Sequence, residues 1–214
     1  MLDTAFLTGC DKNTEWQLPW FISNYLEHNT TRLLVADFGM SKQMRATVDK
    51  LDNVQVFEFT SLVEGWFKKP RAIWEAASHF ANVVCWLDTD CQVMGNIEGI
   101  FRYYQQDGLA MVEDRPWTKR RPGNGPWFNS GVVIADRSHF LRKWMKQCES
   151  NPVQGDQEVL YHMTDLIEKS VMINPIPHKY NTLRLDYIDG IDVKDPLIIH
   201  HTGEKGNQVI RGMM

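Results

Sequence analysis

The sequence predicts a mostly parallel α/β sheet flanked by helices, the Rossmann-like architecture of many nucleotide-binding proteins. Short apolar runs rich in β-branched and aromatic residues alternate with helical patterns of about ten residues or more. The run 83–87 is apolar throughout, as expected for a strand buried on both faces. Two carboxylates follow this run directly, at the edge where open α/β sheets hold their ligands.

The first half of the chain predicts strands and helices in alternation. Strands are expected at 5–8, 32–37 and 54–59, and helices at 16–25, 41–51 and 70–80. Thr14 and Gln17 have the spacing of a capping box, and Ser41 can cap the second helix. Pro70 suits the first turn of the third helix, which leads into the strand 83–87. This half resembles a nucleotide-binding fold.

The second half predicts further elements of the same kind. Strands are expected at 109–112, 132–135 and 197–199, and a short helix at 97–104. Asp136 is expected to cap a helix whose core face includes Trp144. Residues 155–158 should open another helix, with Leu166 and Ile167 in its buried stripe. The polar residues at that helix start are either simple caps or side chains aimed at the site.

Residues 115–127 have little regular pattern. They include three prolines and two glycines, which argue against a helix or a central strand. A loop of this length is usually either functional or disordered. Its two tryptophans and four cationic residues favour a binding loop or a lid.

Length and composition restrict the class of protein. At 214 residues the chain is long enough for one or at most two domains. Its net charge of −4 argues against a nucleic-acid partner, which needs a broad basic face. No early apolar run approaches the roughly 20 residues of a membrane helix, and residues 1–9 lack the basic region of a secretory signal. We expect no transmembrane segment and a cytoplasmic location, with the four cysteines as reduced thiols.

Asp88 and Asp90 are the main candidates for a metal site. At the bend after a strand, both carboxylates can turn toward one cation. Hard oxygen ligands suit Mg²⁺ or Mn²⁺, whose remaining positions can be filled by the oxygens of a nucleotide diphosphate. Aspartates are also common in turns and caps, so the pair could be structural. Aspartate phosphatases begin with a similar motif, but they usually carry Thr or Val where this chain has Gln92.

Two further groups could belong to such a site. Lys68, Lys69 and Arg71 form one basic cluster and residues 115–121 form another; such clusters are usually solvated faces, but beside a metal they can hold phosphates or an acidic substrate. Near the end of the chain, His200 and His201 follow a strand and precede Lys205. Histidines in this position suit a metal and phosphate group.

With these motifs in order, the chain resembles the GT-A glycosyltransferases, and most closely glycosyltransferase family 8, which includes glycogenin and the lipopolysaccharide galactosyltransferases. The resemblance covers nearly the whole chain. It is carried by the motifs Thr8–Asp11, Lys69–Ala72, Leu87–Asp90, Phe128–Gly131, Gly155–Gln157 and His200–Gly203. The family's pattern continues after the last motif with Lys-Pro-Trp, whereas here Lys205 comes one residue early and is followed by Gly206.

The resemblance implies one GT-A domain over 1–214, with a nucleotide-binding half at 1–90 and a sugar and acceptor half at 91–214. It implies that Asp88, Asp90 and His200 coordinate Mn²⁺ on the diphosphate of a UDP-sugar. The remaining residues that it implies for donor binding are Thr8, Gly9, Asp11, Trp16, Lys69, Arg71, Thr89, Ser130, Gly203 and Lys205. Asn129 and Asp156 would grip the donor sugar, and Gln157 would lie beneath its anomeric carbon, which makes these three the catalytic candidates.

The expected activity is metal-dependent transfer of a sugar from UDP to an acceptor hydroxyl, with retention of the anomeric configuration. The acceptor could be a glycan, a lipid-linked sugar, a protein or a small molecule. A nucleotidyltransferase that makes sugar nucleotides is the enzymatic alternative, although such enzymes usually have a glycine-rich phosphate loop where this chain has only Gly9. The other alternative is a non-catalytic sugar-nucleotide or glycan-binding module, in which Trp117 and Trp127 stack on sugar rings.

Overall fold

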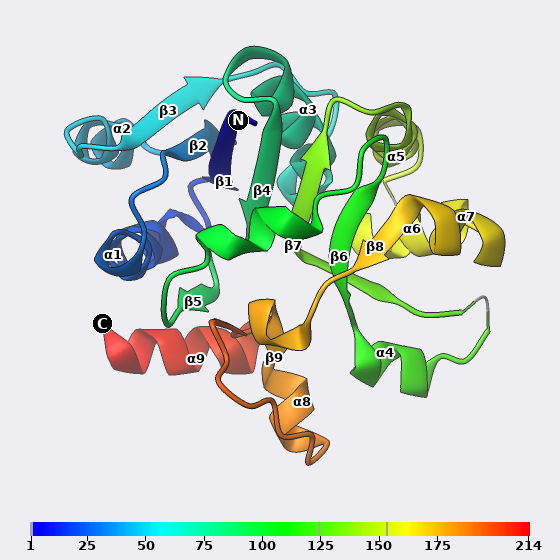
Figure 1. The fold of residues 1–214 in the computed structure, drawn as a ribbon. Helices are drawn as coiled ribbons and strands as arrows, with labels where there is room; N and C mark the ends of the chain where they lie inside the picture. Colours follow the sequence, from blue (N-terminus) through cyan, green and yellow to red (C-terminus); the bar gives the residue numbers. More distant parts are fainter. Residues whose placement is uncertain (1, 124, 153) are drawn as a thin grey trace.

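The computed structural model describes residues 2–123, 125–152 and 154–214 (Figure 1). Within these residues, the main sheet has seven strands in the order β3-β2-β1-β4-β7-β6-β8. These strands are β1 (Thr4–Cys10), β2 (Leu33–Asp37), β3 (Val54–Glu58), β4 (Val83–Leu87), β6 (Leu109–Glu113), β7 (Phe128–Asp136) and β8 (Ile173–Pro175). Strands β3, β2, β1 and β4 run parallel, whereas β7 runs antiparallel to both of its neighbours.

A small second sheet pairs a strand near the end of the chain with a strand that directly follows β4 (Val83–Leu87). Its strands are β5 (Cys91–Val93), β10 (Ile198–His200) and β9 (Thr182–Leu183), in the order β5-β10-β9. β10 pairs antiparallel with β5, so that His200 lies opposite Cys91. This pairing places the residues after β10 next to those that follow β4.

Helices cover both faces of the main sheet, as Figure 1 shows. The α-helices are α1 (Leu18–His28), α2 (Lys42–Val48), α3 (Lys69–His79), α4 (Arg115–Arg120), α5 (His139–Ser150), α6 (Asp156–Met163), α7 (Leu166–Met172), α8 (Arg184–Ile188) and α9 (Gly203–Met213). The short 3₁₀ helices are η1 (Glu15–Gln17), η2 (Gly65–Lys68), η3 (Glu98–Tyr103) and η4 (His178–Tyr180). Residues of α3, α5 and α6 share one core cluster, and residues of α1, α2 and η3 share the other.

The alternation of side chains along β4 explains how the fold presents Asp88. All five residues of β4 are buried, with Trp86 in one core cluster and Cys85 and Leu87 in the other. Because side chains alternate along a strand, Asp88 leaves the sheet on the same face as Trp86. The indole Nε1 of Trp86 donates to Oδ1 of Asp88 at 2.6 Å. The buried strand therefore orients the first of the two carboxylates.

The mixed α/β architecture predicted from the sequence is confirmed, and the predicted strands overlap β1, β2, β3, β4, β6, β7 and β10. Ser41 caps α2 as expected, since its Oγ accepts from the backbone N–H of Met44 at 3.1 Å. Within the described residues, all four cysteines are free and buried. No helix in that part of the chain is long and apolar enough to cross a membrane.

Two predicted caps are wrong. Thr14 and Gln17 do not form a capping box, because the Thr14 hydroxyl donates to Oδ1 of Asp11 at 2.9 Å. Asp136 does not cap α5 either: Ser138 does, by accepting from the backbone N–H of Leu141 at 3.1 Å. At Thr14 the Asp11 carboxylate takes the hydroxyl, and at α5 the hydroxyl of Ser138 takes the backbone N–H group.

Two predictions about the second half are also corrected. Residues 115–120 form the helix α4, although no helix was expected there, because Asp114 caps it and Pro116 occupies its first turn, where a missing N–H costs nothing. The helix opened by Asp156 ends at Met163, and a new one, capped by Asp165, starts at Leu166. Leu166 and Ile167 consequently lie 57% and 74% exposed instead of in a buried stripe.

Candidate functional site

A cavity of about 600 Å³ opens at the carboxyl edge of β1 and β4. Its lining comes from segments that are far apart in the sequence: the ends of β1, β4, β6 and β10 and the starts of α3, β7, α6 and α9. The strand β7 contributes its first residues to this edge because it runs antiparallel to β4. The topology thus gathers at one place most of the motifs singled out in the sequence.

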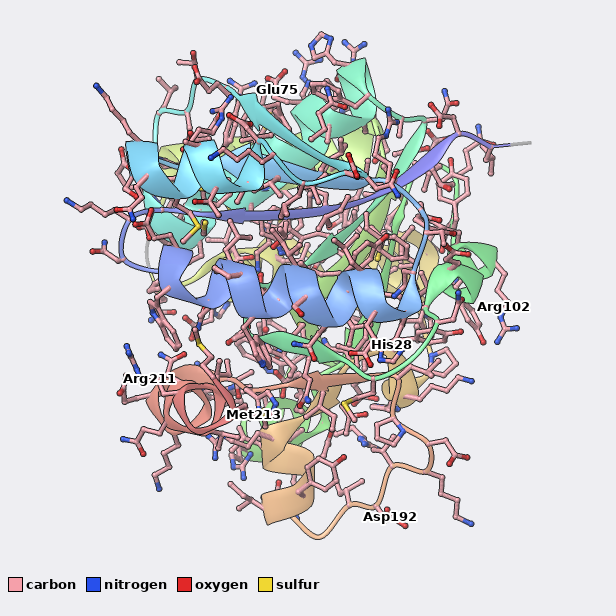
Figure 2. The ribbon with its side chains drawn as sticks, turned by 90° about the vertical axis from the view of Figure 1, so that its left-hand side faces the viewer. His28, Glu75, Arg102, Asp192, Arg211 and Met213 are labelled. Atoms are coloured by element: carbon pink, nitrogen blue, oxygen red, sulfur yellow. The ribbon has the colours of Figure 1, made fainter. Side chains whose placement is uncertain are left out.

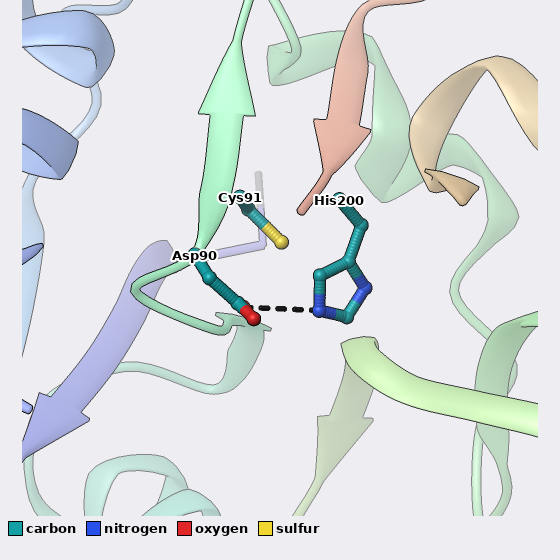
Figure 3. A group of neighbouring side chains, drawn as sticks. All are labelled: Asp90, Cys91 and His200. Carbon is teal, nitrogen blue, oxygen red and sulfur yellow. Dashed lines mark ion pairs between the residues drawn. The ribbon is translucent and has the colours of Figure 1, made fainter. Parts of the chain in front are cut away.

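Asp88, Asp90 and His200 converge in this cavity. His200 Nε2 lies 3.0 Å from Asp90 Oδ1 and 3.8 Å from Asp88 Oδ2, and Figure 3 shows the ring of His200 facing Asp90. Burial would lower the pKa of His200, but the carboxylates of Asp90 and Asp88 raise it above its ordinary value. The two carboxylates therefore stabilise a positive charge at Nε2, whether a proton or a metal ion.

A chain of amides fixes the orientation of the His200 ring. The side-chain oxygen of Asn129 accepts from the backbone N–H of Gly131 at 2.9 Å and from Asn181 Nδ2 at 2.9 Å. The oxygen of Asn181 is therefore left to face His200 Nδ1, at 3.0 Å, so that Nδ1 carries the ring proton. Nε2 is then the nitrogen that faces the carboxylates, and it is the one that can exchange its proton for a metal ion.

The glycine of the Phe128–Gly131 motif has a steric role here. A Cβ on Gly131 would overlap the imidazole ring of His200. Only glycine allows the histidine to lie this close to the backbone of β7.

The donor set suits a hard divalent cation. Asp90, Cys91 and His200 form a group whose ligand atoms lie within 4.8 Å of one another. Burial raises the pKa of Cys91 well above its ordinary value, as do Asp90 and Asp88. A thiol held in its protonated form is a poor ligand. Two carboxylates and one imidazole remain, and they fit Mn²⁺ or Mg²⁺ better than a soft metal.

Lys69 is a buried cation at the centre of the site, with 3% of its surface exposed. Its Nζ lies 2.9 Å from Asp88 Oδ1 and 3.2 Å from Asp156 Oδ2, and it donates to the backbone oxygen of Ser130 at 3.0 Å. Burial opposes its charge, but the two carboxylates outweigh burial and raise the pKa of Lys69. Lys69 therefore joins the predicted metal site to the predicted sugar site.

The carboxylates of Asp88 and Asp156 differ although they share this lysine. Burial would raise the pKa of Asp88, but Lys69, His200 and the hydrogen bond from Trp86 lower it. Burial raises the pKa of Asp156 above its ordinary value, and Lys69 offsets this effect only in part. Asp88 is the better stabilised anion of the two, as a metal ligand should be.

Asn129, Asp114 and Gln157 form a polar cluster in the same cavity. Asn129 Nδ2 donates to Asp114 Oδ2 at 3.1 Å and to Gln157 Oε1 at 3.2 Å, and Gln157 Nε2 donates to Asp114 Oδ2 at 3.1 Å. Burial raises the pKa of Asp114, against the hydrogen bonds from Asn129 and Gln157. Such a set of fixed donors and acceptors is suited to the hydroxyl groups of a sugar.

The side chains of Thr89, Gln17 and Asn207 link the cavity to the C-terminal helix α9. The Thr89 hydroxyl donates to Gln17 Oε1 at 2.6 Å, and Gln17 Nε2 donates to Asn207 Oδ1 at 2.8 Å. On the same helix α9, Arg211 (labelled in Figure 2) lies 3.9 Å over the ring of Trp16. The residue between Asp88 and Asp90 is thereby connected to a helix that begins more than one hundred residues later.

Most of the sequence-predicted residues line the cavity together. They are Gly9, Asp11, Lys69, Asp88, Thr89, Asp90, Asn129, Ser130, Asp156, Gln157, His200 and Gly203. The carboxylate of Asp11 is used within its own loop, where it accepts from the backbone N–H groups of Asn13 at 2.9 Å and Thr14 at 3.0 Å. The prediction is therefore compatible with the geometry of the cavity at these positions.

Four predicted residues lie outside the cavity lining. Thr8 is fully buried within β1, and Trp16 is covered by Arg211. Arg71 points to α5, where its Nε pairs with Glu149 at 3.2 Å. Lys205 is exposed on α9. These four side chains do not line the described cavity, and their role in donor binding stays a prediction.

Sequence analysis assigned no site role to several lining residues, among them Gln17, Asp114, Trp66 and Asn207. Trp117, which it placed in a binding loop, also lines the cavity. Asp114 was visible only as a polar residue after a predicted strand, which is the same signal that pointed to Asp88. Gln17 and Asn207 carry no local signal, since their role depends on a contact between the two ends of the chain.

Comparison with known structures supports the fold. No protein-family model and no curated protein matches the sequence. An active-site mutant of LgtC has a TM-score of 0.69 at 15% identity, covering 94% of this chain and 88% of that one. LgtC, a galactosyltransferase solved with donor and acceptor sugar analogues, gives a TM-score of 0.63 at 16% identity, over 93% and 87% of the two chains.

Two further structures extend this likeness. GlyE, a glycosyltransferase of Streptococcus pneumoniae, has a TM-score of 0.68 at 16% identity, and this chain spans 94% of its own length but 55% of GlyE. Mouse xyloside xylosyltransferase 1 has a TM-score of 0.59 at 13% identity, covering 93% and 97% of the two chains. At such identities the likeness shows a common fold, which is the GT-A fold of these glycosyltransferases.

Proposed function

We propose that the chain is a glycosyltransferase that transfers a sugar from a UDP-sugar to an acceptor hydroxyl, with Mn²⁺ or Mg²⁺ at Asp88, Asp90 and His200. The observation that carries the proposal is the convergence of two carboxylates and an oriented imidazole in a cavity that is also lined by a cluster of fixed polar groups. A nucleotide diphosphate bound to the metal would place its sugar toward that cluster. The GT-A fold supports the same assignment.

The bound cation would supply neutralisation of the charge that builds on UDP as it departs. The protein's own residues do the rest of the work. Lys69 holds Asp88 and Asp156 in place, and Asn129 holds Gln157, whose Nε2 donates to Asp114 and has a second N–H for a sugar hydroxyl. Because these groups are already fixed by one another, little reorganisation is needed when the transition state forms.

Retention of the anomeric configuration is part of the proposal. Asp156 is 5% exposed and paired with Lys69, and the Gln157 amide is already bonded to Asn129 and Asp114. A carboxylate held by a buried cation and an amide are both weak nucleophiles. This geometry favours attack by the acceptor hydroxyl from the side on which UDP departs, with a UDP oxygen taking its proton.

The test is a thermal-shift series with UDP, GDP, CDP and several UDP-sugars, each in Mn²⁺, in Mg²⁺ and in EDTA. A ligand at one hundred times its Kd adds about 2.7 kcal/mol, or roughly 5–10 °C for a domain of this size. We expect UDP compounds to raise the Tm only when a divalent cation is present. The best UDP-sugar is then incubated with candidate acceptors and the release of UDP is measured; stabilisation by no nucleotide would refute the proposal.

A further inference from the structure

One tryptophan at the edge of the cavity is open to solvent. All eight tryptophans lie in the described part of the chain, and Trp66 is the most exposed, at 59%. It nevertheless lines the cavity, on the side where α6 begins. A Cβ on Gly155, next to Asp156, would lie 4.0 Å from the indole Nε1 of Trp66. The exposed ring therefore lies beside the predicted sugar site and not on a remote surface.

The backbone that carries Trp66 is firmly anchored. Lys68 Nζ donates to the backbone oxygen of Phe38 at 2.9 Å and pairs with Glu64 at 2.6 Å. Phe67 packs against the core, and Lys69 is the buried cation of the site. Phe67 and Lys69 point into the protein, whereas the ring of Trp66 is exposed. An indole has only two side-chain torsions, so fixing it against a ligand costs little entropy.

The charges around the cavity argue against an anionic acceptor in addition to the UDP-sugar. Its described lining includes the carboxylates of Asp11, Asp88, Asp90, Asp114 and Asp156. Lys69 and His200 are the cationic side chains in that lining, and both are already paired with these carboxylates. An additional anion would meet no free cation there.

The basic cluster of α4 does not change this balance. Arg115 pairs with Asp186 at 3.1 Å, Arg120 with Asp189 at 2.6 Å, and Arg121 with Glu158 at 2.7 Å. None of these arginines belongs to the described lining of the cavity. The acidic acceptor that the basic clusters suggested in the sequence is therefore not favoured by the structure.

We propose that Trp66 is the platform on which a neutral saccharide acceptor stacks, so that the substrate class is an uncharged glycan. The inference rests on the proposed glycosyltransferase function. The apolar C–H face of a pyranose ring packs against an indole, while its hydroxyl groups need polar partners such as the nearby carboxylates and amides. Trp66 offers the first surface, and the cluster of Asp114, Asn129 and Gln157 lies in the same cavity to offer the second.

The test measures binding of lactose, maltose, cellobiose and digalacturonic acid to the full chain in Mn²⁺ and UDP, by tryptophan fluorescence and saturation-transfer NMR. We expect a neutral disaccharide to bind the wild type and to bind Trp66→Ala about tenfold more weakly, which corresponds to about 1.4 kcal/mol. Trp66→Phe should recover most of the affinity, since a phenyl ring keeps the stacking face. The matched control is Leu62→Ala, at a side chain that is 80% exposed and lies outside the described cavity lining.

Three results would overturn the inference: equal binding by wild type and Trp66→Ala, binding of none of the neutral disaccharides, or a preference for digalacturonic acid. The stabilisation by UDP and Mn²⁺ is measured on the same samples, and it should be unchanged in all three variants. Loss of that stabilisation in the wild type would refute the proposed function instead. If UDP and Mn²⁺ stabilise the protein but Trp66→Ala binds saccharides as tightly as the wild type, the role of Trp66 is refuted and the proposed function is not.

Discussion

At the scale of single residues, the site consists of side chains that are held by other side chains. Trp86 and Lys69 hold Asp88, and Asn181 sets which nitrogen of His200 carries the ring proton. Burial removes competing water from these contacts, which strengthens the hydrogen bonds and fixes the orientation of each side chain. Substitutions that keep the shape and change the chemistry therefore test the role of each residue most sharply.

Asp88→Asn should abolish metal-dependent UDP binding and leave the fold intact. The amide keeps the shape of the carboxylate but removes the charge that a divalent cation needs. Lys69 retains Asp156 and Ser130 as partners, so we expect the Tm to fall by only a few degrees. UDP release and circular dichroism are measured together, with Asp90→Asn as the parallel variant. Full activity in either variant would contradict the assignment of Asp88 and Asp90 as metal ligands.

Asn207→Asp should weaken UDP binding by about tenfold or more. The Asn207 oxygen already accepts from Gln17, so its NH₂ group is the donor that remains for a ligand in the cavity, and aspartate lacks it. Gln208→Glu is the matched control, because it adds the same charge to an exposed position of the same helix. Calorimetry with UDP and Mn²⁺ gives the two affinities. Equal losses in both variants would mean that only the net charge of α9 matters.

At the scale of elements, α4 is a fixed wall of the cavity and not a loose loop. The guanidinium of Arg121 lies 4.2 Å from the ring of Trp117 and 5.6 Å from that of Trp127, whose own ring stacks on Tyr161 at 3.8 Å. This stack joins α4 to α6, and the pair of Arg120 with Asp189 joins it to α8. Residue 124, within the loop predicted for this segment, is outside the described residues.

Replacing Arg120 and Arg121 with Ala should raise the KM for donor or acceptor and change the Tm little. Both arginines are more than 40% exposed, and exposed ion pairs contribute about 0.2–1 kcal/mol each. Their effect should appear in how α4 presents Trp117 to the cavity. Lys119→Ala on the same helix is the control. A large fall in Tm would show that the stack is a structural requirement of the fold.

At the scale of the whole molecule, one carboxylate joins distant segments on the side opposite α3. Glu98, at the start of η3, accepts from the backbone N–H and hydroxyl groups of Thr30 and Thr31, at distances of 2.8–3.1 Å. The hydrogen bonds from Thr31, more than those from Thr30, lower the pKa of Glu98 from about 4.5 to about 2. The charged form is therefore the one that stabilises the fold.

This pKa shift predicts a pH dependence of stability. A lowered pKa in the folded state stabilises the protein above the unfolded pKa, near 4.5, and the stabilisation is lost as the pH falls toward 2. Glu98→Gln should therefore be less stable than the wild type at pH 7, and the difference should shrink steadily between pH 4.5 and pH 2. Urea unfolding across this range gives the values, with Glu27→Gln on the exposed side of α1 as the control. A difference that is independent of pH would contradict the role of the charge.

The sequence by itself determined the class of fold and predicted two carboxylates at its ligand-binding edge. Strand and helix periods survive in any environment because they reflect which side chains are buried, so the alternation and the buried strand before Asp88 were enough to predict a mostly parallel sheet. The edge at which a ligand binds follows from that topology. Asp88 and Asp90 could accordingly be placed there before their distances were known, and the resemblance to glycosyltransferase family 8 added His200 to them.

Only the tertiary structure decided which other side chains reach the cavity. Gln17 and Asn207 meet across 190 positions of sequence. Lys69 lies in the cavity, whereas Arg71, two residues later on the same helix, pairs with Glu149 outside it. Helix α4 forms despite Pro116 because this proline lies in its first turn and Asp114 caps that turn. Contacts between distant segments set these outcomes, and they depend on packing and desolvation, which leave no periodic pattern in the sequence.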